Sequence, residues 1–182
     1  MKQVLTILLT LLLLSCVVIN NEDYPENWPA PAEESESVLR SIEGSYKNFG
    51  KNSSGKGSNA LNSYFFEPNS GLFNTKVIKI IPTSEETIEI EAWSNDSFIK
   101  KIELQKGKDF KVSSKGIVIS KSESTAEGPI GAGSVKYVFS TAKDQSLIVK
   151  SKFFGVGIYV IPYSAHMSEW ERFEIAERNL TN

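Results

Sequence analysis

The single histidine of the chain, His166, is the residue best suited to proton transfer near neutral pH. It stands in the segment Ser164-Ala165-His166-Met167-Ser168-Glu169, so hydroxyls and a carboxylate are close to it in sequence. A general base needs a nucleophile or a water within reach, and often a carboxylate that orients it. Nothing in this spacing fixes that geometry. We therefore expect His166 to lie in a surface loop, and we expect no catalytic residue and no enzyme.

Other residue patterns also lack the spacing of a reactive site. One histidine and one cysteine cannot supply the ligands of a transition-metal site, so we predict neither a metal nor a cofactor. The glycine-rich residues 128–133 lack the Lys-Ser/Thr pair of a phosphate-binding loop, and we interpret them as a flexible hairpin loop. Residues 38–182 carry 19 Lys and Arg against 16 Asp and Glu, which is too weak an excess for a nucleic-acid surface.

The only cysteine, Cys16, follows an apolar N-terminal segment. Lys2 gives this segment a positive start, and residues 4–14 are apolar except for two threonines. The run is too short to cross a bilayer, which takes about 20 apolar residues, and it has the length of a signal-peptide core. A lone cysteine also excludes a disulfide within the chain, so an exported domain must rely on its hydrophobic core.

The segment Leu13-Leu14-Ser15-Cys16 resembles the lipobox of bacterial lipoproteins, in which a small residue precedes an obligatory cysteine. The resemblance implies that residues 1–15 are a signal peptide and that the Cys16 thiol takes a diacylglyceryl group. Two or more acyl chains anchor a protein stably in a lipid bilayer. In the sorting of such lipoproteins, an aspartate directly after the cysteine retains the protein at the inner membrane. This chain has Val17 there, which implies the outer membrane and a domain that faces the periplasm. The alternative is an ordinary secreted protein with a chance cysteine.

Residues 16–37 are predicted to form an acidic, proline-rich tether between the anchor and the folded domain. They contain three prolines and six acidic residues, and no basic residue. Such a chain is extended and buries little surface. Tyr24 and Trp28 could dock on the domain or lie at the membrane interface, but we expect them to be loosely held. Residues 38–182 then form one β domain.

The remainder of the chain has the pattern of an antiparallel β protein. Residues 87–92 alternate strictly, with Glu89 and Glu91 opposite the isoleucines between them, as expected of a strand with one wet face. Further segments rich in β-branched or aromatic residues recur roughly every 8–12 residues, separated by turn residues. The sequence therefore predicts a single antiparallel β-barrel or sandwich. Residues 170–175 fit either a strand or a helix, and we favour the strand.

The order of these elements resembles the lipocalin-like β-barrels of small bacterial lipoproteins, which we favour over a sandwich. Gly44-Ser45-Tyr46 stands where such barrels have a Gly-x-aromatic motif in the first strand, and Trp170-Glu171-Arg172-Phe173 stands at the closing strand. The resemblance covers residues 38–176 and implies that Arg172 packs across Tyr46 at the closed end. Residues 133–137 are similar, more faintly, to a loop of periplasmic lysozyme-inhibitor lipoproteins, which often carry a disulfide.

Large apolar side chains are concentrated in residues 64–66 and 153–159. They are either core residues or the lining of a cavity that holds a small apolar ligand. Our candidate ligand-binding residues are Tyr64, Phe66, Phe153, Phe154 and Tyr159.

Two functions are then in competition. The first is a lipid-anchored barrel that binds a small hydrophobic ligand or lipid. The second is an envelope interaction protein, either an accessory subunit or an inhibitor of a periplasmic enzyme. An empty interior favours the first, and a filled interior with an exposed loop favours the second.

Overall fold

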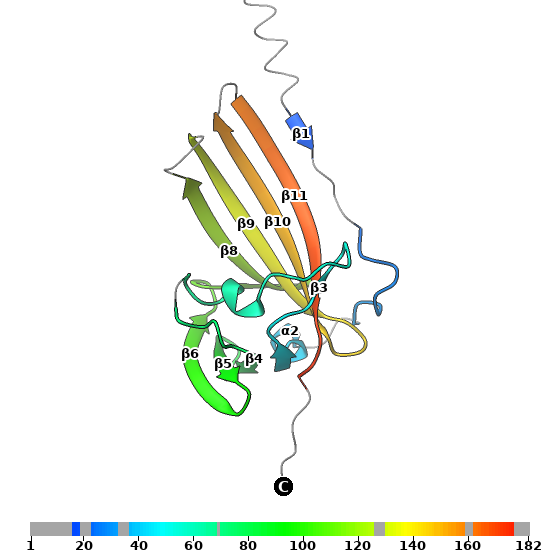
Figure 1. Cartoon of the computed structure of the whole chain (residues 1–182), viewed down its shortest axis with the longest axis vertical. Coiled ribbons are helices and arrows are strands. Elements are labelled where there is room, and N and C mark those ends of the chain that lie inside the picture. The colour runs from blue at the N-terminus through cyan, green and yellow to red at the C-terminus, as the bar shows by residue number, and fades with distance from the viewer. Residues whose placement is uncertain are drawn as a thin grey trace, which may run out of the picture.

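The computed structural model describes residues 16–18, 23–32, 37–68, 70–125, 130–158 and 162–176. Within these ranges the chain is mainly β, with two antiparallel sheets, one short α-helix and one 3₁₀ helix (Figure 1). The prediction of a mainly β fold is confirmed. The predicted signal peptide, residues 1–15, lies outside the described residues. In the part of the chain that is described, no helix has the length and hydrophobicity needed to cross a bilayer.

The smaller sheet is antiparallel and has the strand order β2-β4-β5-β6. Its strands are β2 (Gly44–Lys47), β4 (Val77–Pro82), β5 (Thr87–Ser94) and β6 (Ser97–Gln105). On β5, Ile88 and Ile90 are each 1% exposed, whereas Glu89 lies on the other face and pairs with Lys101 at 2.8 Å. The alternation in residues 87–92 therefore marks a half-buried strand, as predicted.

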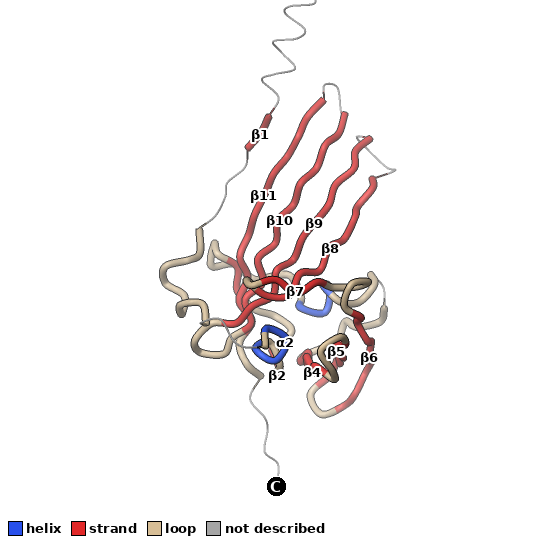
Figure 2. Tube along the Cα trace, turned by 180° about the vertical axis from the view of Figure 1, so that it is seen from behind, coloured by secondary structure: helices blue, strands red, loops and turns tan. Residues whose placement is uncertain are grey.

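The larger sheet has the strand order β1-β11-β10-β9-β8-β7. Its strands are β1 (Cys16–Val18), β7 (Lys111–Ser113), β8 (Gly116–Thr125), β9 (Ile130–Thr141), β10 (Leu147–Ile158) and β11 (Pro162–Phe173). The short strand β3 (Lys51–Asn52) also pairs with β11. Neighbouring strands of the larger sheet are antiparallel, except that β1 runs parallel to β11. Strands β8 to β11 extend together past α2, η1 and the smaller sheet, as both views show (Figure 1, Figure 2).

The hydrophobic core lies between the two sheets and is filled by side chains. The short helix α2 (Val38–Ser41) contributes Leu39, and the 3₁₀ helix η1 (Leu61–Tyr64) contributes Leu61 and Tyr64. The Tyr64 ring makes edge contacts with Tyr137, Phe139 and Phe173 of the larger sheet. Fully buried core side chains from the two sheets are Ile78, Ile80, Ile88 and Ile90, and Ile117, Phe139, Leu147, Val149 and Phe173. Aromatic rings from η1 and the larger sheet therefore pack against one another in the core.

The chain that follows β11 joins the two sheets. Tyr46 of β2 forms a β-bridge with Ile175, and the backbone amide of Ala176 donates to the Ser45 carbonyl at 2.8 Å. Residues 170–173 are strand, so the strand predicted for residues 170–175 is confirmed over its first four positions, Ile175 forms only an isolated bridge, and the helix alternative is wrong.

Arg172 does not play the part that the lipocalin resemblance implies for it. Its guanidinium donates to the Asp144 carboxylate at 2.5 Å and to the Ser146 hydroxyl at 3.0 Å. These partners lie in and after the β9–β10 turn. Because neighbouring residues of a strand point to opposite faces, Arg172 lies on the face away from the buried Phe173. The Tyr46 hydroxyl donates instead to the Ile42 carbonyl at 3.0 Å.

Two segments that we expected to be loops belong to long strands. Residues 130–133 are the first part of β9, whereas residues 126–129 lie outside the described residues. His166 is in β11, opposite Phe154 of β10. The loop predictions are therefore wrong for His166 and for residues 130–133. The likeness of residues 133–137 to an inhibitor loop is also not supported, since they are β9 residues.

Part of the predicted tether is packed against the domain. The Tyr24 ring lies 5.2 Å from the Trp170 ring and 6.1 Å from the Trp28 ring, both in edge geometry. The Ala32 backbone amide donates to the Thr141 carbonyl at 2.9 Å. The expectation of loosely held aromatics is therefore wrong, because Tyr24 finds an aromatic partner on β11 and Ala32 finds a backbone partner on β9.

Candidate functional site

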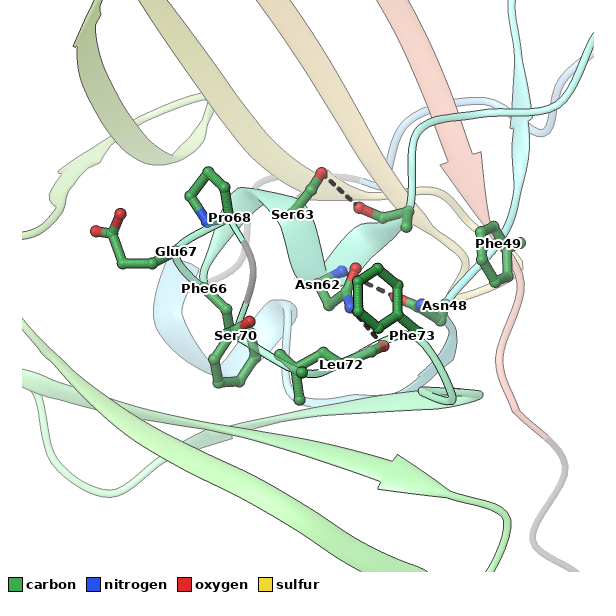
Figure 3. A pocket seen from close by; sticks show the side chains of 12 residues that line it. Asn48, Phe49, Asn62, Ser63, Phe66, Glu67, Pro68, Ser70, Leu72 and Phe73 are labelled. Carbon is green, nitrogen blue, oxygen red and sulfur yellow. Dashed lines mark hydrogen bonds between the residues drawn. The ribbon is translucent and has the colours of Figure 1, made fainter.

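A surface pocket of about 330 Å³ opens beside η1, between the end of β2 and the loop that leads to β4 (Figure 3). Phe49 and Phe73 stand in its lining with exposed rings, 58% and 87% accessible. Phe66 and Leu72 are buried and form its apolar floor. The pocket therefore presents two aromatic rings to solvent next to an apolar hollow.

Two asparagines hold the walls of this pocket together. The buried Asn48 follows β2; its side-chain oxygen accepts the Asn62 backbone amide at 2.8 Å, and its side-chain amide donates to the Thr75 carbonyl at 3.2 Å. The side-chain amide of Asn62, on η1, donates to the Leu72 carbonyl at 3.2 Å. These bonds join three separate segments at one place. Because their polar groups are used within the wall, the two asparagines act as structural residues.

The remaining polar groups of the pocket do not form a reactive set. The Ser63 hydroxyl donates to the Ala60 carbonyl at 2.7 Å, and Glu67 is exposed in the loop after η1. No histidine or cysteine stands among the lining residues. Nucleophilic catalysis needs a nucleophile that is hydrogen-bonded to a base, whereas the Ser63 hydroxyl donates to a backbone carbonyl. The volume is at the lower end of the range for small-molecule pockets, and the surface suits a small apolar group.

The structure separates the side chains that we expected to form one ligand site. Phe66 lines the pocket, but Tyr64 is 3% exposed and lies in the core against Phe139. Phe154 is 56% exposed, on the part of β10 that extends beyond the core. Tyr159 lies outside the described residues. The described candidates therefore do not share one cavity.

Phe153 has a structural role in the larger sheet. Its ring covers Gly133 and Gly155, which are register partners on β9 and β10. An alanine Cβ would lie 2.8 Å from the ring at Gly133 and 2.5 Å from it at Gly155, closer than Cβ atoms approach other groups. Glycine is therefore required at both positions while the ring stays in place. An aromatic ring that covers bare glycine backbone stabilises a strand with little side-chain surface of its own, so residues 130–133 can pair.

A buried carboxylate connects η1 to the larger sheet. Glu171 is 1% exposed and accepts hydrogen bonds from the Asn59 backbone amide at 2.8 Å, from the Asn59 side chain at 3.1 Å, and from the Tyr64 hydroxyl. Burial raises the pKa of the Glu171 carboxyl, and the two Asn59 bonds lower it in part. Because each of these donors belongs to the segment around η1, we assign Glu171 a structural role.

Glu171 should make the stability of the protein depend on pH. Its pKa is above the unfolded value of 4.5, so the folded state holds the proton more tightly. The stability that protonation of Glu171 contributes is fully present below pH 4.5. It is lost as the pH rises through the pKa of Glu171 in the folded state. Within that window the free energy of unfolding falls as the pH rises. Urea denaturation between pH 4.5 and 8 should therefore show a falling contribution that Glu171→Gln removes.

Glu174→Gln is the matched control for this experiment. Lys47 pairs with Glu174 at 2.8 Å and lowers the pKa of that exposed carboxyl, so its small contribution appears above the unfolded pKa and has the opposite sign. Parallel curves for the wild type and Glu171→Gln would contradict the assignment.

The sequence patterns did not single out Asn48, Phe49, Leu72 or Phe73. The signal available was weak: Phe49 precedes a glycine directly after a strand, and Leu72 and Phe73 follow Gly71 in a turn. Apolar residues at turn positions, where polar ones are usual, are the feature that could have indicated an exposed aromatic pair.

Cys16 and His166 are both placed in the larger sheet by their backbones. In the parallel pairing of β1 with β11, Cys16 is opposite Ser164 and Val18 is opposite His166. Among the described residues, no three His, Cys, Asp or Glu side chains are grouped so that they could hold a metal ion.

No protein-family model, no curated protein and no solved structure matches the chain.

Proposed function

We infer that the chain is a lipid-anchored protein of the bacterial envelope that binds a small hydrophobic ligand or lipid and has no catalytic activity. The observation that carries the binding is the pocket beside η1, where Phe49 and Phe73 are exposed next to an apolar floor. Burial of one such side chain is worth about 1.5–3 kcal/mol. A bound apolar group would supply that burial.

The anchor in this proposal is a set of acyl chains on Cys16. Its support is the lipobox Leu13-Leu14-Ser15-Cys16, preceded by a short apolar segment with Lys2 at its start. The partners are then a lipid bilayer and the small ligand, without a role for nucleic acid. The proposed location is the outer membrane, with the domain facing the periplasm.

A lipocalin-like arrangement of the two sheets is part of the proposal. Two contacts support it where the sheets meet. The Tyr46–Ile175 bridge connects β2 to the chain after β11, and the Lys106–Phe110 bridge lies where the chain passes from β6 to β7. The filled aromatic core favours a ligand at the side pocket over one at the centre of the fold.

A fluorescent fatty acid should bind the protein with roughly micromolar affinity, and Phe73→Asp should weaken that binding by about tenfold or more. The reason is the loss of one aromatic wall and the placement of a charge beside apolar surface. Fluorescence titration measures the effect. Phe98→Asp is the control, because Phe98 is 53% exposed on β6 and is not one of the residues that line the pocket.

Phe154→Asp separates this pocket from the ligand site expected at residues 153–159. If Phe154→Asp abolishes binding and Phe73→Asp does not, the ligand site is on the larger sheet. If no probe binds, the alternative gains support: an envelope interaction module or an inhibitor of a periplasmic enzyme. The filled core favours that alternative, and pull-down of a defined partner from envelope extract would establish it.

A further inference from the structure

The ends of the four long strands form a part of the molecule that stands apart from the core. We define the projecting end as residues 121–125, 130–136, 151–158 and 162–168, which belong to β8, β9, β10 and β11 respectively. Figure 1 shows these strands extending past α2, η1 and the smaller sheet, and the reverse view in Figure 2 agrees. Because this part of the sheet does not pack against the core, both of its faces are open to solvent or to a partner.

Apolar side chains of the projecting end are exposed on both of its faces. Phe154 is 56% exposed and Val156 is 47% exposed, and both lie on the same face of β10. Met167 of β11 is 48% exposed and lies on the other face, opposite Phe153 in the register. Monomeric soluble proteins rarely expose large apolar groups side by side, and such patches mark contacts with proteins or membranes.

Charged residues border the apolar part of the projecting end. The sequence from Phe153 to Met167 contains no Asp, Glu, Lys or Arg. Directly before it, the exposed Lys152 is the register partner of the exposed Lys136, on the same face as Phe154. In the sequences of the four segments, the only carboxylate is Glu123, on β8. A pair of lysines next to an uncharged apolar strand end is complementary to a bilayer, which has anionic headgroups at its surface and apolar chains beneath them.

The backbone of β1 brings the anchor residue to this same end. β1 pairs in parallel with β11, and Cys16 is opposite Ser164, near the start of β11. Acyl chains on Cys16 would therefore enter the bilayer beside the β10–β11 hairpin.

We propose that the projecting end is a contact surface for an anionic phospholipid bilayer, with Phe154 and Val156 in the acyl-chain boundary and Lys136 and Lys152 at the headgroups. The proposal rests on the anchor at Cys16 that belongs to the proposed function. Val156 lies about 13 Å along the strand from Lys152 at about 3.3 Å per residue. Interfacial apolar groups enter the acyl boundary by about 5–10 Å, so this separation places the two kinds of side chain in the two layers.

Quenching by brominated phospholipids tests the contact on the full chain. The protein carrying Phe154→Trp is purified from bacterial membranes and reconstituted in phosphatidylcholine–phosphatidylglycerol vesicles whose acyl chains carry bromine. The introduced indole should shift its emission to the blue and lose intensity. Phe98→Trp is the matched control, since it replaces an almost equally exposed phenylalanine on β6 and should show neither change. Because the Phe98 ring contacts Trp93 with a centroid distance of 5.5 Å, each variant is compared with its own spectrum in vesicles without bromine.

The lysines supply a second readout. In the Phe154→Trp background, Lys136→Glu with Lys152→Glu should reduce the quenching, and Lys136→Arg with Lys152→Arg should retain it. Each lysine near an anionic surface contributes about a fivefold factor in binding.

Flotation of the vesicles separates this proposal from the anchor. If the wild type floats, the Cys16→Ala variant does not, and Phe154→Trp is quenched no more than Phe98→Trp, the anchor stands and the contact surface is refuted. If the wild type is not acylated, the anchor is refuted, and quenching of the same chain added to vesicles decides on the surface alone. A concentration-dependent dimer in sedimentation, without quenching, assigns the projecting end to a second copy of the chain and refutes the bilayer contact.

Discussion

Replacing Cys16 with alanine should abolish the incorporation of fatty acid into the protein and leave it unprocessed or soluble. Cys16 is the only thiol of the chain, so no other residue can take the diacylglyceryl group. The effect is large because anchoring by two or more acyl chains contributes about 0.8 kcal/mol for each buried methylene group. Labelling of growing cells with a radioactive fatty acid, followed by membrane fractionation, measures it.

The control for this experiment is Ser15→Ala, which keeps a small residue before the cysteine and should preserve both labelling and membrane association. Incorporation that survives in Cys16→Ala would refute the lipobox assignment. Secretion of an unlabelled wild-type protein would support the alternative of a secreted protein with a chance cysteine.

Replacing Phe173 with alanine should lower the free energy of unfolding by about 3–5 kcal/mol. Phe173 is fully buried at the end of β11 and its ring centroid is 6.3 Å from that of Tyr64. Its loss would leave a cavity between the two sheets beside the hydrogen bond from Tyr64 to Glu171. Domains of this size are stable by only about 5–15 kcal/mol, so the change removes a large share of the total. Urea denaturation followed by circular dichroism measures it.

Phe73→Ala is the matched control because it deletes the same ring from a position that is 87% exposed. It should change stability by no more than about 0.5 kcal/mol and should still weaken binding of the apolar probe at the pocket. Equal losses of stability from Phe73→Ala and Phe173→Ala would contradict the description of the core.

Local patterns were sufficient to predict the individual strands. The alternation around Glu89 identified both the strand and the face that points away from the core, because each residue's environment there depends on its immediate neighbours. A strand was also predicted at residues 170–175, where Glu171, Phe173 and Ile175 share one face, and it is present over residues 170–173. What the pattern did not indicate is that this face is buried at Glu171. The donors that make this burial tolerable, Asn59 and Tyr64, are more than a hundred positions away in the sequence.

The candidate site could not be predicted for the same physical reason. The pocket exists because Asn48 and Asn62 bring together the end of β2, η1 and the loop before β4. Sequence concentration of aromatics was a poor guide, since Tyr64 is used in the core and Phe153 covers two glycines. Glycine content was equally misleading at residues 130–133, where the ring of a neighbouring strand makes a strand out of an expected loop.

If the chain is anchored to a membrane as proposed, the docking of Tyr24 on Trp170 would limit how far the domain could move. A flexible, glycine-rich chain of 22 residues would have an end-to-end distance of about 26 Å, an extended proline-rich chain would reach farther, and either would let the domain move over a wide range above the bilayer. The ring contact at 5.2 Å and the Ala32–Thr141 backbone bond remove most of that slack. An attached domain would then keep one height and one orientation. It would therefore contact only molecules that reach that height above the bilayer, because the tether would not allow the domain to move towards others.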